Sequence, residues 1–288
     1  MQSGGNGLPC TDSFSGASLP LIFSATMPPL SVDAVGNLSL TLSSMTTVVS
    51  GSSAQGSLAS WDDVDSALVQ TYALMGVDMS DMLSLLPPPC TLQPLVLAQA
   101  QSPTIRALGV AMMAVESQVT GFLALGAELL ISSIPQLTGG MSAAINLLSQ
   151  KLVIQAQQQP ITSSSLLTNA PFVTSVITAA FNEAQGSSGS TYQINLVSSV
   201  VASLSGPAEL YRVPAVQVMR GGVPVRGLDV LSAFTTVAQM PAVQAGASAA
   251  VRQSVLSGST QALLPYLPSG LPSQVQQVYL SMMTTRGR

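Results

Sequence analysis

Residues 104–134 read TIRALGVAMMAVESQVTGFLALGAELLISSI, and the choice between a membrane protein and a helical bundle rests on this stretch. A membrane-spanning helix needs about 20 consecutive apolar residues. Residues 119–134 fall short of that length and carry Glu128, and the apolar run at residues 107–115 is shorter still. We therefore expect no transmembrane segment, and we interpret the stretch as two buried helices, at residues 104–118 and 119–134.

Helical spacing of apolar residues continues toward the N-terminus. These residues recur at steps of three and four, which places them on one helix face: Val32, Val35, Leu38, Leu42, Met45 and Val49. Ser60, followed by Asp62 and Asp63, predicts an N-cap with acids in the first turn of a helix over residues 61–75. Residues 38–42 also alternate with period two, so a short β element in the N-terminal third is an alternative there.

Toward the C-terminus, the same spacing predicts helices at residues 141–158, 172–184, 193–204, 228–239, 242–256 and 273–283. Proline stands near the start of successive apolar segments, at Pro103, Pro171, Pro207, Pro214, Pro241 and Pro272. Proline is well tolerated at the first helical position. The pattern as a whole predicts an all-α, multi-helix bundle.

The composition and the positions of proline- and glycine-rich stretches suggest three regions along the chain. Residues 1–25 are expected to be an irregular arm, residues 26–100 an acidic helical region, and residues 101–288 a helical region whose C-terminal part carries arginines. The last two regions could form one continuous domain. Residues 87–89 are three prolines and predict a stiff connector, and residues 186–190 (GSSGS) predict a flexible one.

The composition excludes several classes of function. Charged residues make up 7% of the chain, against a usual share of about 25%, yet 47% of the residues are hydrophobic and can form a core. One lysine and seven arginines cannot follow a phosphate backbone, so we expect no nucleic-acid partner. The absence of histidine excludes a Ser-His-Asp triad and a histidine-ligated zinc. We expect no enzyme, no cofactor and no metal.

The few charges are sorted by sign along the chain. Residues 1–105 hold seven aspartates and no lysine or arginine, and six arginines lie from Arg212 onward. This sorting is either chance among few charges or a sign of head-to-tail contact between copies. The candidate assembly contacts are Asp62, Asp63, Asp65, Asp78, Asp81, Arg212, Arg220, Arg226 and Arg252. For the aspartates, charges at helix starts are the favoured alternative, because the helix dipole stabilises acids there; paired carboxylates for catalysis or Ca²⁺ are the less favoured one.

The sequence also bears on the compartment. Cys10 and Cys90 match no zinc spacing; they could form one disulfide, or remain two buried free thiols. Asn37 begins a glycosylation sequon, which agrees with secretion. The first residues carry neither a basic region nor an apolar run, so no signal peptide is visible. We expect an extracellular or secreted protein, with a cytosolic protein as the alternative.

Two helical segments carry a resemblance to a known family. Residues 172–181 (FVTSVITAAF) and 247–256 (ASAAVRQSVL) are rich in Ser, Ala and Val, in a chain with scarce charge and ends of opposite sign. In this composition the chain resembles the non-repetitive helical domains of arthropod silk proteins, although it has 13 methionines, 19 prolines and no poly-alanine tract. The resemblance implies a self-assembling protein of a secreted material.

These observations lead to one leading hypothesis of function and two alternatives. The leading hypothesis is a non-enzymatic structural protein that self-associates into an extracellular material or a particle, because low charge promotes association. The alternatives are a helical carrier that binds apolar ligands in a cavity lined by Met and Leu, and a viral or phage structural protein. For the 13 methionines, filling of the core is the favoured interpretation.

Overall fold

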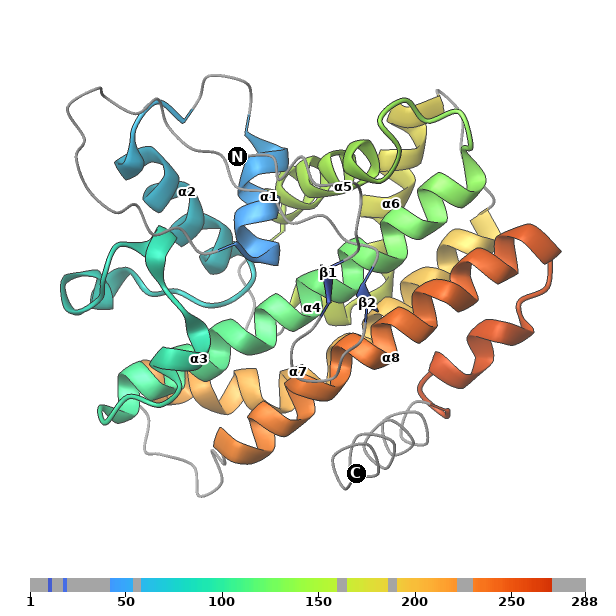
Figure 1. The fold of residues 1–288 in the computed structure, drawn as a ribbon. Helices are drawn as coiled ribbons and strands as arrows, with labels where there is room; N and C mark the ends of the chain where they lie inside the picture. The colour runs from blue at the N-terminus through green and yellow to red at the C-terminus, as the bar shows by residue number, and fades with distance from the viewer. Residues whose placement is uncertain are drawn as a thin grey trace.

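The computed structural model describes residues 42–53, 58–159, 165–185, 191–221 and 230–270, together with the backbone of residues 10–11 and 18–19. For residues 185, 230–235, 237 and 238 it describes the backbone alone. These parts form a bundle of α-helices and short 3-10 helices, as predicted (Figure 1). One antiparallel pair of two-residue strands, β1 (Cys10–Thr11) and β2 (Ser18–Leu19), is added to it. The β alternative at residues 38–42 lies mostly outside the described residues.

The centre of the bundle is one long helix, α4 (Pro103–Ser133). The prediction of two helices was wrong, because no breaker stands at residues 118–119 and burial continues through the predicted boundary. Pro103 occupies the first turn and the Ser102 side chain caps the helix. By length and composition α4 is sufficient to cross a membrane, but most of it is buried among the other helices, as in the core helix of a bundle.

Two further long helices pack along α4: α7 (Thr191–Met219) and α8 (Val230–Ser257) (Figure 1). Their prolines were expected to mark helix starts, but Pro207 and Pro214 lie inside α7, and Pro241 lies inside α8. An interior proline removes a helical hydrogen bond and costs about 3 kcal/mol. Burial against α4 offsets that cost, so the predicted helices 193–204, 228–239 and 242–256 become two long ones.

The other side of α4 is covered by α5 (Gly140–Gln157), and α6 (Ala170–Gln185) packs on α5 and α7. Both match the predicted helices 141–158 and 172–184. Two 3-10 helices, η3 (Leu166–Thr168) and η4 (Gln261–Tyr266), pack against α7 and α8 respectively. The predicted connector at residues 186–190 and the predicted helix at residues 273–283 lie outside the described residues.

The N-terminal part begins with α1 (Ser44–Ser52), which packs on α5, and α2 (Trp61–Leu74). Ser60 caps α2 in a capping box with Asp63, which confirms the predicted N-cap. The chain then forms η1 (Ser80–Leu85), η2 (Pro89–Thr91) and α3 (Pro94–Leu97), the last of which packs against α4. Of the predicted helix face over residues 32–49, residues 42–49 are described: Met45 and Val49 are buried in α1, whereas Leu42 lies before this helix and is exposed.

A single contiguous core joins the acidic region to the rest of the chain. Buried side chains from both parts belong to it, including the methionines Met45, Met75, Met79, Met112 and Met240. These methionines lie in the core, as the favoured interpretation of the methionine content predicted.

Candidate functional site

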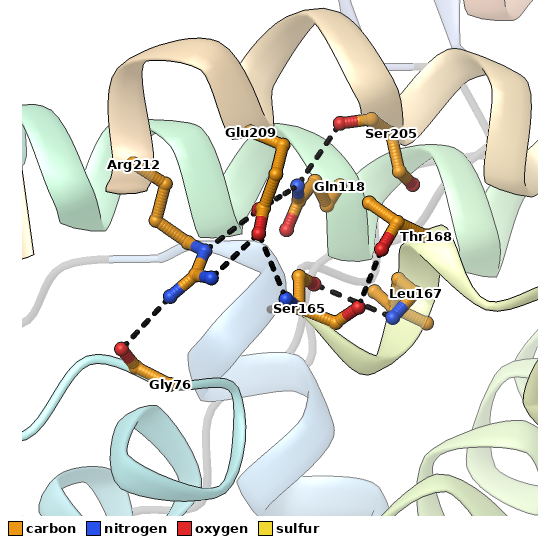
Figure 2. A network of polar contacts seen from close by, with 8 residues as sticks. All are labelled: Gly76, Gln118, Ser165, Leu167, Thr168, Ser205, Glu209 and Arg212. Carbon is orange, nitrogen blue, oxygen red and sulfur yellow. Dashed lines mark hydrogen bonds and ion pairs between the residues drawn. The ribbon is translucent and has the colours of Figure 1, made fainter. Parts of the chain in front are cut away.

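The most extensive polar cluster described lies where α7 meets α4, and its centre is an ion pair between Glu209 and Arg212 (Figure 2). The two residues are three positions apart on α7, so they lie on one helix face. Arg212 Nε donates to Glu209 Oε2 at 2.7 Å, and Nη2 donates to Oε1 at 2.6 Å. This bidentate pairing fixes the direction of both side chains. The Arg212 side chain is fully buried.

Four other groups complete the cluster around this pair. Arg212 Nη1 donates to the Gly76 carbonyl oxygen at 3.0 Å, which ties the turn after α2 to α7. Gly76 has a φ of +84°, and a Cβ there would lie 2.7 Å from Arg212 Nη1, so only glycine fits. The Ser165 N–H donates to Glu209 Oε1 at 2.9 Å. Gln118 Nε2 donates to Glu209 Oε2 and to the Ser205 carbonyl oxygen.

These contacts determine the charge of Glu209. Burial alone would raise the pKa of its carboxyl, but the bonds from Arg212, Ser165 and Gln118 outweigh burial and hold the pKa below its ordinary value. The carboxylate therefore stays ionised, and its oxygens already accept four hydrogen bonds. A carboxylate held in this way is suited to fixing structure and not to accepting a proton from a substrate.

The buried pair changes the interpretation of Arg212, which the sequence offered as a contact between copies. Because this side chain is fully buried and bonded within its own chain, it is not accessible to a second copy. The prediction placed Arg212 on the surface because it assumed that charges sorted by sign along the sequence are also sorted in space. The burial of Arg212 shows that this assumption does not hold here. Arg212 instead connects α7 to the acidic N-terminal region.

Arg252 has a similar internal partner. Its Nε and Nη2 donate to the two carboxylate oxygens of Glu128 at 2.7 and 2.9 Å. The Glu128 side chain is 1% exposed, whereas that of Arg252 is 56% exposed. The Glu128 carboxylate was the reason to regard residues 119–134 as a poor membrane span. Its negative charge is balanced by Arg252, which lies in α8. The bond and the charge of Glu128 raise the pKa of Arg252.

A third acid, the half-buried Glu116 on α4, has no arginine or lysine bonded to it within the described residues. The Tyr72 hydroxyl donates to Glu116 Oε1 at 2.6 Å, between α2 and α4. Burial raises the pKa of Glu116, although hydrogen bonds from Tyr72 and Ser43 act in the opposite direction. Burial and the nearby carboxylate raise the pKa of Tyr72 well above its ordinary value.

The five aspartates singled out from the sequence lie in α2, η1 and the turn between these two helices. Asp62 and Asp63 are in the first turn of α2, and Asp81 is in the first turn of η1. Asp78 accepts bonds from Ser80 just before η1, and Asp65 accepts the N–H of Cys90 at 2.7 Å. The favoured interpretation as charges at helix starts therefore holds for Asp62, Asp63 and Asp81. Among the described residues no group of three or more acids or cysteines is placed to hold a metal ion.

The remaining predicted residues divide into described and undescribed ones. Arg220 is exposed after α7, and its charge helps the Ser80 hydrogen bonds to lower the pKa of Asp78. Cys90 is a buried free thiol whose pKa is raised to about 12 by burial and by Asp65. Because Cys90 is free, the structure contains no Cys10–Cys90 disulfide, and the alternative of a buried free thiol describes Cys90. The side chain of Cys10 lies outside the described parts. Arg226 and Asn37 also lie outside them.

Two hollows are described on the surface. The larger, of about 950 Å³, lies among the end of α1, the loop before α5, and α5 and α6. It is lined mainly by neutral side chains, including the amides of Gln136, Asn146 and Gln150, and by one acid, Glu183. Glu183 forms an ion pair with Lys151, the single lysine. The second hollow, of about 610 Å³, lies between α2 and the proline connector. Neither hollow is lined by methionine. The alternative function, a carrier that binds apolar ligands in a cavity lined by Met and Leu, therefore stays a prediction that these two hollows do not support.

Sequence reasoning did not find the Glu209 cluster, the Tyr72–Glu116 contact or the hollow beside α2. The sequence contained only weak evidence of the Glu209 cluster, because Glu209 and Arg212 are three residues apart, as in many ion pairs on helix surfaces. No family model, no curated protein and no solved structure matches the chain.

Proposed function

We propose that the protein is a non-enzymatic structural protein that self-associates, in an extracellular material or a particle. The supporting observation is the make-up of its surface. Among the described residues, ten large hydrophobic side chains are exposed: Leu42, Leu83, Leu85, Leu95, Val96, Ile154, Tyr192, Leu210, Leu256 and Leu264. The exposed charged residues there are seven: Asp62, Asp63, Asp78, Asp81, Glu183, Arg220 and Arg252. Typical soluble domains have about 25% charged residues, whereas this chain has 7%.

Such a surface gives copies of the chain little mutual repulsion and many apolar contact points. Low net charge promotes association, and an apolar side chain that is exposed on one copy gains free energy when a contact between copies buries it. The bundle interior supports a structural role as well. Glu209 and Glu128 are each bonded to an arginine, and their oxygens are occupied by internal contacts. Neither acid is arranged to transfer a proton in an open cleft.

The test is sedimentation velocity of the intact chain over a hundredfold range of concentration, at low and at high salt. We expect the mass to rise above the 29.4 kDa of one chain as concentration rises. We expect a smaller rise at high salt, because salt screens contacts between the acidic and basic parts. A single 29.4 kDa species at every concentration and in both buffers contradicts the proposal.

Variants at the surface show which contacts matter. Leu210 and Leu256 are 74% and 76% exposed, so Leu210→Gln and Leu256→Gln should fold normally and weaken association. Gln217 is exposed on the same helix as Leu210, and Gln217→Ser serves as the control. Equal association of all three variants and the wild type would show that exposed apolar groups do not drive it.

A further inference from the structure

The hollow between α2 and the proline connector has two chemically different walls, and we call it the acidic groove. Its lining consists of Asp62, Asp65, Ser66, Val69 and Gln70 from α2, and Leu83, Leu86, Pro87, Pro88 and Pro89 from the chain after η1 begins. The α2 residues recur at steps of three and four, so they form one face of that helix. The opposite wall is apolar and rigid, because three consecutive prolines restrict the backbone there.

The acidic groove has binding capacity that the bundle itself does not use. Leu83 is 39% exposed, and Pro87 and Pro88 are exposed too. Asp62 is exposed and makes no hydrogen bond or ion pair with another described residue. A volume of about 610 Å³ is in the range that small ligands or a few side chains fill. An occupant that fits must combine apolar side chains with positive charge.

Residues 271–288 of the same sequence have this chemistry. They read LPSQVQQVYLSMMTTRGR and contain Arg286 and Arg288 and no acid, so their charge is opposite to that of Asp62 and Asp65. Their apolar residues include Val275, Val278, Tyr279 and Met282, a spacing that suits one helix face. Segments of this kind commonly bind by laying an apolar face into a groove.

The position of the acidic groove in the bundle favours a second copy over the chain's own segment. Residue 270 is the last described residue before the segment, and it follows η4. Figure 1 shows η4 and α2 on opposite sides of the bundle. The acidic groove and the departure point of the segment are therefore separate surfaces. A contact between them is heterologous, and such contacts propagate from copy to copy.

We propose that the acidic groove binds residues 271–288 of a second copy of the chain, with Arg286 and Arg288 near Asp62 and Asp65. This inference rests on the proposed self-association and names the two surfaces that carry it. The contact includes few charges in a wide groove, so it is reversible and weakens with salt.

A direct test uses a fluorescein-labelled synthetic peptide of residues 271–288 and fluorescence anisotropy at low ionic strength. The receptor is the full chain carrying Arg286→Gln and Arg288→Gln, so that its own segment competes less. We expect saturable binding of the peptide. A peptide with both arginines replaced by glutamine should bind about tenfold more weakly, since each exposed charge pair contributes a few-fold.

Matched receptor variants locate the binding site. Asp62→Asn in the receptor should weaken binding about threefold, and adding Leu83→Gln about tenfold, because one removes a charge and the other part of the apolar wall. Asp81→Asn removes the same charge outside the groove lining and should leave binding unchanged. Absence of binding, or equal affinity for the Asp62→Asn/Leu83→Gln receptor and its parent, overturns the inference.

Sedimentation of the full chain with its arginines intact separates this inference from the proposed function. If the Asp62→Asn/Leu83→Gln variant associates less than the wild type, the groove contact is supported. If both associate equally, the groove contact is wrong and the proposed function stands. If the wild type stays monomeric while the peptide binds only to the receptor lacking Arg286 and Arg288, the segment occupies its own groove, and both the second copy and the proposed function are wrong.

Discussion

Arg212 occupies a position where an arginine is costly to bury and even more costly to remove. Its guanidinium is fully buried and neutralises Glu209, which has no other cation bonded to it among the described residues. Removing one partner of a buried pair leaves an uncompensated charge. The arginine also donates to the Gly76 carbonyl oxygen, so its loss would break a contact between distant parts of the chain.

We expect Arg212→Met to lower the free energy of unfolding by about 3–5 kcal/mol, measured by urea denaturation followed by circular dichroism. The Glu209→Gln/Arg212→Met double variant should recover a large part of this loss, because no charge is then left buried. A double variant as unstable as the single one would show that the cost comes from the lost contact to Gly76 and not from the ion pair.

Glu116 and Glu209 should respond to pH in opposite directions. The pKa of Glu209 is lowered in the folded state, so its contribution to stability is present above its unfolded pKa and is lost as pH falls through the folded value. The pKa of Glu116 is raised, so the folded chain binds more protons than the unfolded chain between the two pKa values. Stability from Glu116 therefore decreases as pH rises through its folded pKa.

We expect Glu116→Gln to raise the free energy of unfolding at pH 7 by about 1 kcal/mol, because it removes a desolvated charge and keeps an acceptor for Tyr72. The gain should shrink toward pH 4, where the glutamate of the wild type becomes protonated. Denaturation at the two pH values, with Asp81→Asn as the surface control, measures this. A variant less stable than the wild type at pH 7 contradicts the assignment.

At the level of single residues, the sequence predicts local chemistry better than long-range contacts. The Ser60 cap with its following acids was readable because a capping pattern spans only a few residues. The bonds of Arg212 to Gly76 and of Arg252 to Glu128 join residues more than a hundred positions apart. The order of charges along the sequence does not show which distant residues come into contact. For this reason the prediction from the sequence wrongly placed Arg212 on the surface.

At the level of elements, the sequence predicted the lengths of α2, α5 and α6. It did not predict the lengths of α4, α7 and α8, which continue through predicted helix boundaries. Proline is read as a start signal because it is tolerated in the first turn, which holds for Pro103. Pro207, Pro214 and Pro241 instead remain inside helices, since packing against α4 outweighs local preference. The packing itself is close enough in places to require glycine.

Gly109 and Gly206 provide a matched test of this packing, because both are helical glycines. A Cβ at Gly109 would lie 2.6 Å from the Leu97 carbonyl carbon and 2.7 Å from the Pro94 oxygen, and would also clash with the Ala98 nitrogen, all of them backbone atoms of α3 and its end. A Cβ at Gly206 meets nothing within 4 Å. Gly109→Ala should thus cost about 2 kcal/mol or more, and Gly206→Ala should gain about 0.5–1 kcal/mol.

Urea denaturation of the two variants beside the wild type measures both effects. Opposite signs support close packing of α3 on α4. A stabilising effect at both positions would show that α3 moves away readily, and that the start of α4 is less tightly covered than the structure indicates.

At the level of the whole molecule, the acidic region and the rest share one core. Met45 and Met75 lie in the same buried cluster as Met112 and Met240, and Arg212 bonds across the junction to Gly76. The sequence left open whether residues 26–100 and 101–288 form one domain or two. A shared core favours one cooperative unit, because separating the two parts would expose buried apolar surface on both.

Trp61 makes this cooperativity measurable, since it is the single tryptophan and lies at the start of α2 in the acidic region. Its fluorescence reports on that region, whereas the circular dichroism signal at 222 nm reports on all helices. We expect the two thermal unfolding curves to share one midpoint, as coincident probes do in a two-state transition. Arg212→Met should lower both midpoints together, because the bond it removes belongs to the same unit. Suppose that the Trp61 fluorescence has a lower midpoint than the circular dichroism, or that Arg212→Met lowers the midpoint of the fluorescence and not that of the circular dichroism. Either result would mean that residues 44–100 unfold before the α4–α7–α8 centre.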